Sequence, residues 1–178
     1  MQRELGRLVE AEIVYQRGLP PQATFTFKHA LIQDTAYTSL LKSTRQQYHQ
    51  RIAQVLETQC PATMETQPEL LAHHSTEAGR TEQAVAYWQR AGQQAIERSA
   101  HVEAIHHLTR GLEVLTTLPE TAERLQQALT LHLALGVPLV ATKGLGAPEV
   151  EHVYTRALDL CQQVGDTPHL HQAKRLDP

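Results

Sequence analysis

The stretch Val85–Pro119, VAYWQRAGQQAIERSAHVEAIHHLTRGLEVLTTLP, decides the fold. Its first half has apolar or small residues at helical spacing, which predicts an amphipathic helix that Thr81 caps and that runs to Arg98. Its second half repeats this spacing, which predicts another helix over 100–116, capped by Ser99. The stripe of the first helix comprises Ala84, Val85, Trp88, Ala91, Gly92 and Ala95. The stripe of the second comprises Val102, Ile105, Leu108, Leu112 and Leu115.

The same stretch fits the tetratricopeptide template, a helix–turn–helix unit of about 34 residues with small residues at fixed positions. With Val85 as its first residue, the repeat-defining positions hold Trp88, Ala91, Gly92, Ala95, Ala104, Leu108 and Gly111. Glycine inside a helix costs about 1 kcal/mol relative to alanine, so close helix packing is the expected reason for Gly92. Weaker matches to the tetratricopeptide template lie one helix earlier and one helix later in the sequence. An irregular helical bundle with chance matches stays open as the alternative.

The remaining sequence also favours helices, because Leu and Ala supply the apolar content while aromatic residues make up only 4%. Ser43 begins a capping-box pattern, and its helix is expected to bury Tyr48, Ile52, Val55 and Leu56. Residues 61–67 are predicted to be a break. Further helices are predicted at 29–41, 68–78, 120–140 and 148–164, the last with Pro148 in its first turn and Gly165 after its end.

The N-terminal residues follow a different pattern. A short helix at 1–10 precedes two predicted strands, Glu12–Arg17 and Ala23–Lys28, with a Gly/Pro turn at 18–22 between them. In the second strand Phe25 and Phe27 share one face. Helix, hairpin and helix in this order are typical of the tail of a winged helix. Two strands alone are marginal in water, so this hairpin is expected to pack on helices.

These patterns predict a mainly α chain, in which a tetratricopeptide-like array of helical hairpins follows a small winged-helix remnant with one β-hairpin. The predicted segments are 1–41 for the remnant, 42–66 for a connecting helix, 67–165 for the repeats and 166–178 for a tail.

Three segments resemble a known family: FKHALIQDTAY at 27–37, LLAHH at 70–74 with AVAYW at 84–88, and ATKGLGAPEV at 141–150. They resemble the junction between winged helix and repeats in the large bacterial predicted ATPases that are attached to class III adenylate/guanylate cyclase domains. The resemblance implies a signal-transduction protein with cyclase, nucleotide-binding module, winged helix and repeats in that order. The sequence lacks the Gly-x-x-x-x-Gly-Lys-Ser/Thr phosphate loop, and no cyclase metal-binding carboxylates can be placed.

The resemblance therefore implies a C-terminal regulatory region without catalysis or a cofactor of its own. ATP or ADP would belong to an upstream nucleotide-binding domain of the parent protein. It also implies a role for His29, because a winged-helix histidine near this position contacts the phosphates of bound ADP in related ATPases. The predicted helix N-terminus favours anions there. The alternative for His29 is a capping or packing residue at a strand–helix corner.

Metal binding is not predicted, although the sequence has eleven histidines. The pairs His73–His74 and His106–His107 consist of neighbours, which point about 100° apart on a helix and do not readily share one ion. His169 and His171 fall in the predicted tail.

Other function classes fit less well. A DNA-binding winged helix is a weak alternative that rests on Lys42, Arg45, His49 and Arg51, and the net charge of −3 gives no bulk attraction to nucleic acid. No nucleophile motif such as Gly-x-Ser-x-Gly occurs, so an enzyme is not predicted. Cys60 and Cys161 are expected to be structural.

The sequence also gives expectations for location and partners. Residues 1–10 are polar and amphipathic, unlike a signal peptide, and no apolar run approaches the roughly 18 residues of a membrane span, so we expect a cytoplasmic protein. The expected partner is a protein or peptide in a groove of the repeats.

Overall fold

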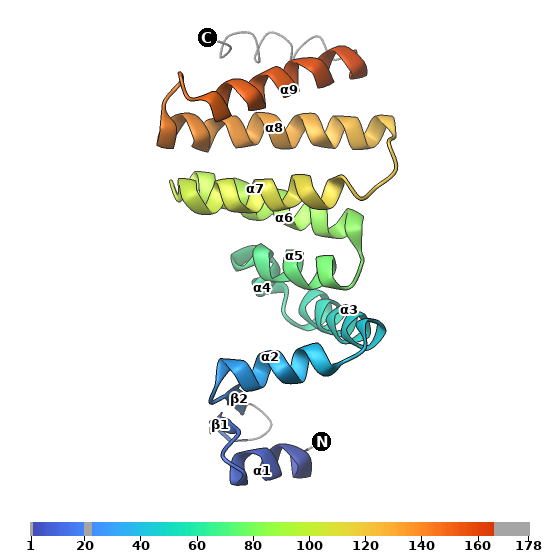
Figure 1. Ribbon diagram of the computed structural model, residues 1–178, viewed down its shortest axis with the longest axis vertical. Coiled ribbons are helices and arrows are strands. Elements are labelled where there is room, and N and C mark those ends of the chain that lie inside the picture. Colours follow the sequence, from blue (N-terminus) through green and yellow to red (C-terminus); the bar gives the residue numbers. More distant parts are fainter. Residues whose placement is uncertain (1, 20–22, 166–178) are drawn as a thin grey trace. The chain divides into compact units, whose positions relative to one another are not determined.

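The computed structural model describes residues 2–19 and 23–165, which are mainly α-helical with one two-stranded antiparallel sheet, as the sequence predicts (Figure 1). The chain divides into two compact units. The N-terminal unit comprises Met1–Arg45, and the helix array comprises Gln46–Pro178. The boundary lies inside α3. The predicted tail at 166–178 and the predicted turn residues 20–22 lie outside the described residues.

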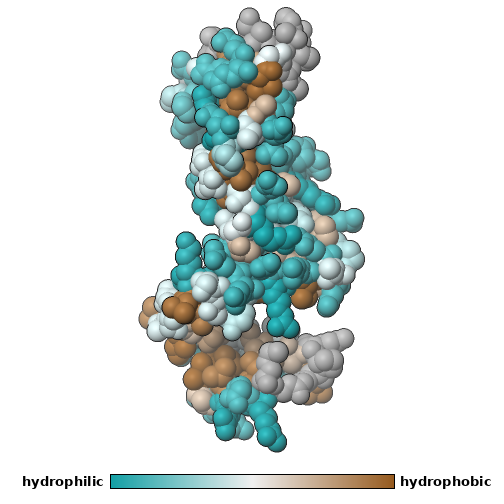
Figure 2. All heavy atoms as spheres, turned by 90° about the vertical axis from the view of Figure 1, so that its right-hand side faces the viewer, coloured by the Kyte–Doolittle hydropathy of each residue, from teal (hydrophilic) through white to brown (hydrophobic). Residues whose placement is uncertain are grey.

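The N-terminal unit contains α1 (Gln2–Glu10), β1 (Val14–Arg17), β2 (Thr24–Phe27) and α2 (Ala30–Ser39). The predicted β-hairpin is confirmed, with Val14 opposite Phe27 in the antiparallel register. Its core is small, because no residue of α2 is buried and Leu31 is 80% exposed. Figure 2 shows hydrophobic side chains gathered over this unit at the lower end of the view.

The helix array contains seven helices among the described residues. Their bounds are α3 (Lys42–Gln59), α4 (Pro61–Thr66), α5 (Pro68–Glu77), α6 (Thr81–Glu97), α7 (His101–Leu115), α8 (Ala122–Lys143) and α9 (Pro148–Val164). From α5 onward each helix packs on the next, so that α6 to α9 form successive layers (Figure 1).

Burial of the amphipathic stripes explains this stacking. All six residues of the predicted α6 stripe are buried. On α7, Ala104, Leu108 and Gly111 are buried, as are Val114 and Leu115. Val102 was predicted to lie on the inner face, but it is 76% exposed. Residue 102 lies about 200° around the helix from the fully buried Ala104, so its side chain is on the opposite face of α7.

Three glycines allow neighbouring helices to approach closely. A Cβ atom on Gly92 would lie 2.5 Å from the Cγ of Leu108, which is closer than real side chains tolerate. A Cβ on Gly111 would lie 3.2 Å from the Cβ of Trp88. In the next layer, a Cβ on Gly136 would lie 2.4 Å from the Oη of Tyr154. Glycine is therefore needed at these positions because a side chain would clash with the neighbouring helix, and not because of the backbone conformation.

Several predicted helix starts are wrong. Thr81 is the first residue of α6, after the N-cap Arg80, and its side chain does not cap the helix. Ser99 has a left-handed φ of 58° and ends α6, while Ala100 occupies the N-cap of α7. The Ala100 amide bonds back to the carbonyl of Ala95 at 2.8 Å, which closes the last turn of α6. Serine is used here to end one helix rather than to begin the next.

Two predictions for residues 42–67 are also wrong. The predicted break at 61–67 contains the short helix α4, because Pro61 fits the first turn of a helix. Helix α3 begins at Lys42, so Ser43 lies inside it. The predicted buried face of α3 is exposed at Tyr48, Ile52 and Val55, and its buried residues are His49 and Ala53. Helix α3 is thus attached through a different face than its apolar residues suggest.

Helix α8 is long and apolar enough to cross a membrane by length and composition, in contrast to the expectation that no such stretch exists. Single helices of this kind are weak evidence for a membrane span. Leu131, Leu135 and Leu139 are buried, and α8 packs on both α7 and α9. A role as the central core helix of the array accounts for its composition.

We expect Gly92→Ala to destabilise the array. Alanine gains about 1 kcal/mol of helix propensity, but overpacking against Leu108 costs about 1–3 kcal/mol. The expected net loss is about 1 kcal/mol in the free energy of unfolding, measured by urea denaturation. Gly146→Ala is the control, because an added Cβ at Gly146 meets nothing within 4 Å. Equal stability of both variants and the wild type would show that the close approach is not required.

Candidate functional site

An apolar groove lies where α7, α8 and α9 meet. Its volume is about 450 Å³. Its walls comprise Ile105, Leu135, Leu139, Pro148 and Val153. Leu135, Leu139 and Val153 belong to the buried core, so the groove lies directly on it.

The rim of this groove is polar. Lys143 at the end of α8 forms an ion pair with Glu149 in the first turn of α9. The hydrogen bond from Lys143 lowers the pKa of the Glu149 carboxyl below its ordinary value. Thr109 and His152 complete the rim. An apolar floor with polar groups at its edge can hold an apolar side chain while the rim bonds to a peptide backbone.

His29, the predicted nucleotide-sensing residue, lies in the N-terminal unit. It occupies the N-cap of α2 with extended backbone angles, φ −131° and ψ 127°, and its side chain makes no capping hydrogen bond. The residue is exposed. The predicted position at a strand–helix corner is confirmed, whereas its role stays a prediction.

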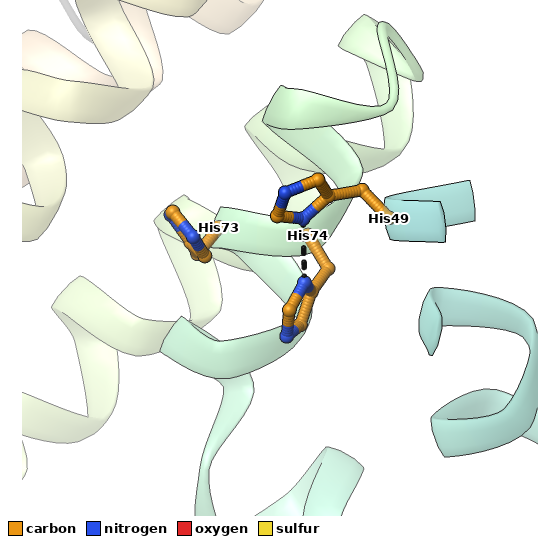
Figure 3. A group of neighbouring side chains, drawn as sticks. All are labelled: His49, His73 and His74. Carbon is orange, nitrogen blue, oxygen red and sulfur yellow. Dashed lines mark hydrogen bonds between the residues drawn. The ribbon is translucent and has the colours of Figure 1, made fainter. Parts of the chain in front are cut away.

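Three histidines from two helices form a cluster inside the helix array (Figure 3). His49 on α3 faces His73 and His74 on α5, and one ring nitrogen from each lies within 4.8 Å of those of the other two. The Nδ1 atoms of His49 and His74 are 2.8 Å apart. His49 is buried, with 7% of its surface exposed, while His74 is half-buried and His73 is exposed.

Protonation of His74 is disfavoured. Burial, and to a smaller extent the neighbouring His49 and His73, together lower its pKa from 6.5 to about 4, against a smaller opposite effect of Glu77. His74 is therefore a neutral imidazole at pH 7, with a lone pair available to a hydrogen-bond donor or a cation.

The sequence does not reveal this cluster. In the sequence His73 and His74 are only neighbours on one helix, and His49 is one of the basic residues of the DNA-binding alternative. The decisive partner comes from α3, whose packing face was predicted wrongly. In the described part of the chain, this is the one place where three histidine, cysteine or acidic side chains converge closely enough to hold a metal ion.

The residues of the DNA-binding alternative have different surroundings. Arg45 lies over the ring of Tyr37 at 5.1 Å. His49 is buried, and Lys42 and Arg51 are exposed. Two or three surface charges give only weak, nonspecific attraction to phosphates.

Two further histidines are packed in the array. The ring of His107 stacks on Trp88 with centroids 5.5 Å apart, and burial lowers its pKa. On α8, burial, and to a smaller extent the charges of Arg156 and His152, together lower the pKa of His132 from 6.5 to about 4. Both environments stabilise the neutral ring. Of the two cysteines, Cys161 is buried in the array and Cys60 is half-buried.

The chain is similar to an uncharacterized protein of Rhizobium meliloti (strain 1021), with 31% identity over 159 residues. The match covers 88% of this chain but only 15% of that protein. No protein-family model matches the chain. No solved structure matches it significantly.

We expect the free energy of unfolding to fall as the pH is lowered from 6.5 to about 4. In this window the unfolded chain binds a proton at His132 that the folded chain does not bind, so acid favours unfolding. Above this pH range His132 is neutral in both the folded and the unfolded chain, and below it His132 is protonated in both. His132→Leu should flatten the decline, measured by urea denaturation at several pH values between 7 and 5. An unchanged slope in this variant would exclude His132 as a contributor.

Proposed function

We propose that the chain is a non-catalytic scaffold that binds a protein or peptide segment in the groove of α7, α8 and α9. The observation that carries the proposal is the groove's apolar floor with its polar rim. Helical arrays commonly bind their partners through such concave surfaces. The fitting ligand is a segment that inserts an apolar side chain beside Ile105 and Leu139 and lays its backbone along the rim.

We further propose that the array is tetratricopeptide-like. Support comes from the small residues of its template positions, since Gly92 faces Leu108 and Gly111 faces Trp88 at close range. The helix pairs α6–α7 and α8–α9 both pack in this way, with Gly136 against Tyr154 in the second pair.

We also infer that the scaffold belongs to the regulatory part of a cytoplasmic signal-transduction ATPase of the cyclase-associated type. The family resemblance of residues 27–37, 70–88 and 141–150 supports this assignment. A relative in which the matched segment is 15% of the length is compatible with such a multidomain context. In that context, occupancy of the groove would be coupled to the state of an upstream nucleotide-binding domain.

The second candidate is a nucleotide sensor at His29. An exposed imidazole at a helix N-terminus, without a capping hydrogen bond, is suited to an anion. The two functions make different demands on this chain, because the sensor needs ADP and the scaffold does not.

Peptides selected from a random display library test the groove. We expect selected peptides to share an apolar anchor and to bind the Ile105→Ala variant about tenfold more weakly, because a wall of the anchor pocket is lost. Val102→Ala is the matched control on the same helix, since Val102 is exposed and lies outside the groove. Fluorescence anisotropy measures affinity, and circular dichroism verifies folding. Binders that do not distinguish the two variants would contradict the proposal.

Isothermal titration of ADP separates the two candidates. The scaffold function predicts no heat of binding for this chain. Saturable heat that His29→Ala removes, while His106→Ala leaves it unchanged, would favour the nucleotide sensor instead.

A further inference from the structure

We propose that His49, His73 and His74 form a zinc site that fastens α3 onto α5. The proposed zinc site is independent of the proposed groove, because its residues lie on α3 and α5, whereas the groove lies where α7, α8 and α9 meet.

The geometry is close to what zinc requires. Zinc binds imidazole nitrogen at about 2.0–2.1 Å in a tetrahedron, which places neighbouring ligand nitrogens about 3.3 Å apart. The Nδ1 atoms of His49 and His74 are already 2.8 Å apart, and all three nitrogens lie within 4.8 Å of one another. A shift of about 1.5 Å or less closes the site. His73 is exposed and can supply most of this shift by rotating its side chain.

A cation can replace the hydrogen bond between His49 and His74. Their Nδ1 atoms lie 2.8 Å apart, so one ring donates a proton to this bond and the other accepts it. When a cation takes the place of this hydrogen bond, the shared proton moves to the Nε2 atom of the donating ring. Both Nδ1 lone pairs then face the ion, and neither ring loses or gains a net proton.

The ligand set indicates which ion binds. Three nitrogen donors favour zinc and its transition-metal neighbours, whereas calcium and magnesium require oxygen ligands. The fourth tetrahedral position is open to water. Glu77 follows His73 by four residues on α5, which places its carboxylate on the same side of the helix as a negative charge near the ion.

The site would complete the attachment of α3. At present α3 is held by the buried Ala53 and by Glu57, whose carboxylate lies 2.9 Å from Arg80 and accepts a hydrogen bond from Tyr87 at 3.1 Å. His49 precedes Glu57 by eight residues, which is about 12 Å along a helix. An ion at His49 therefore adds a second fixed point, and two points define the direction of α3.

The direct test is titration of the full chain with zinc sulfate, followed by isothermal calorimetry. His169→Gln/His171→Gln is used as the background to remove the tail histidines. We expect one zinc ion per chain and a rise in Tm that EDTA reverses, with no effect of magnesium. No saturable binding in this background would overturn the proposal.

Single substitutions identify the ligands. His49→Gln and His73→Gln should each weaken zinc binding at least about tenfold, since even changes around metal ligands cost about 10–100-fold. His106→Gln is the matched control, because His106 is also an exposed member of an adjacent pair but lacks a third histidine. His73 is exposed, so its substitution keeps the test valid if His49→Gln does not fold. Binding that His73→Gln leaves unchanged would exclude this site.

Cobalt substitution distinguishes histidine from cysteine ligands. We expect visible absorption of tetrahedral cobalt without a thiolate charge-transfer band. A thiolate band that disappears in Cys60→Ser would assign the ion to a cysteine and contradict the proposal.

Discussion

The close approach of α6 and α7 at Gly92 and Leu108 is the constraint on which the array depends. A side chain at residue 92 would lie 2.5 Å from Leu108, so these helices can lie at this distance only because glycine is present. Gly111 brings Trp88 near, and a Cβ on Gly111 would also lie 3.6 Å from Leu131 of α8. Gly136 repeats the arrangement against Tyr154 of α9. Each of the helices α7, α8 and α9 is therefore positioned by a close contact with the helix that precedes it.

The two proposed sites use this stack in different ways. The groove is a surface of the helix layers themselves, since three of its wall residues, Leu135, Leu139 and Val153, belong to the buried core. The histidine cluster instead concerns α3, which joins the stack through polar groups and only one fully buried alanine. The two proposals together describe a binding surface on the packed helices combined with one helix, α3, whose attachment depends on zinc.

The sequence predicts features that depend on local periodicity. The α6 stripe, the hairpin, Gly165 at the end of α9 and the close packing of Gly92 all follow from patterns within one or two elements. It does not predict which face of α3 packs, because Tyr48, Ile52 and Val55 form as plausible a stripe as the observed His49 and Ala53. The cluster was missed for the same reason, since His49 lies 25 residues from His74. Ser99 was misplaced because serine suits both an N-cap and a left-handed helix end.

Native-state hydrogen exchange tests the central claim most directly. If the layers depend on the α6–α7 contact, the amides of these helices exchange most slowly, and Gly92→Ala accelerates exchange in α6, α7, α8 and α9 together while the β1–β2 hairpin is unaffected. Acceleration confined to the turn of α6 around residue 92 would contradict the account, because the outer layers would then be stable without that contact.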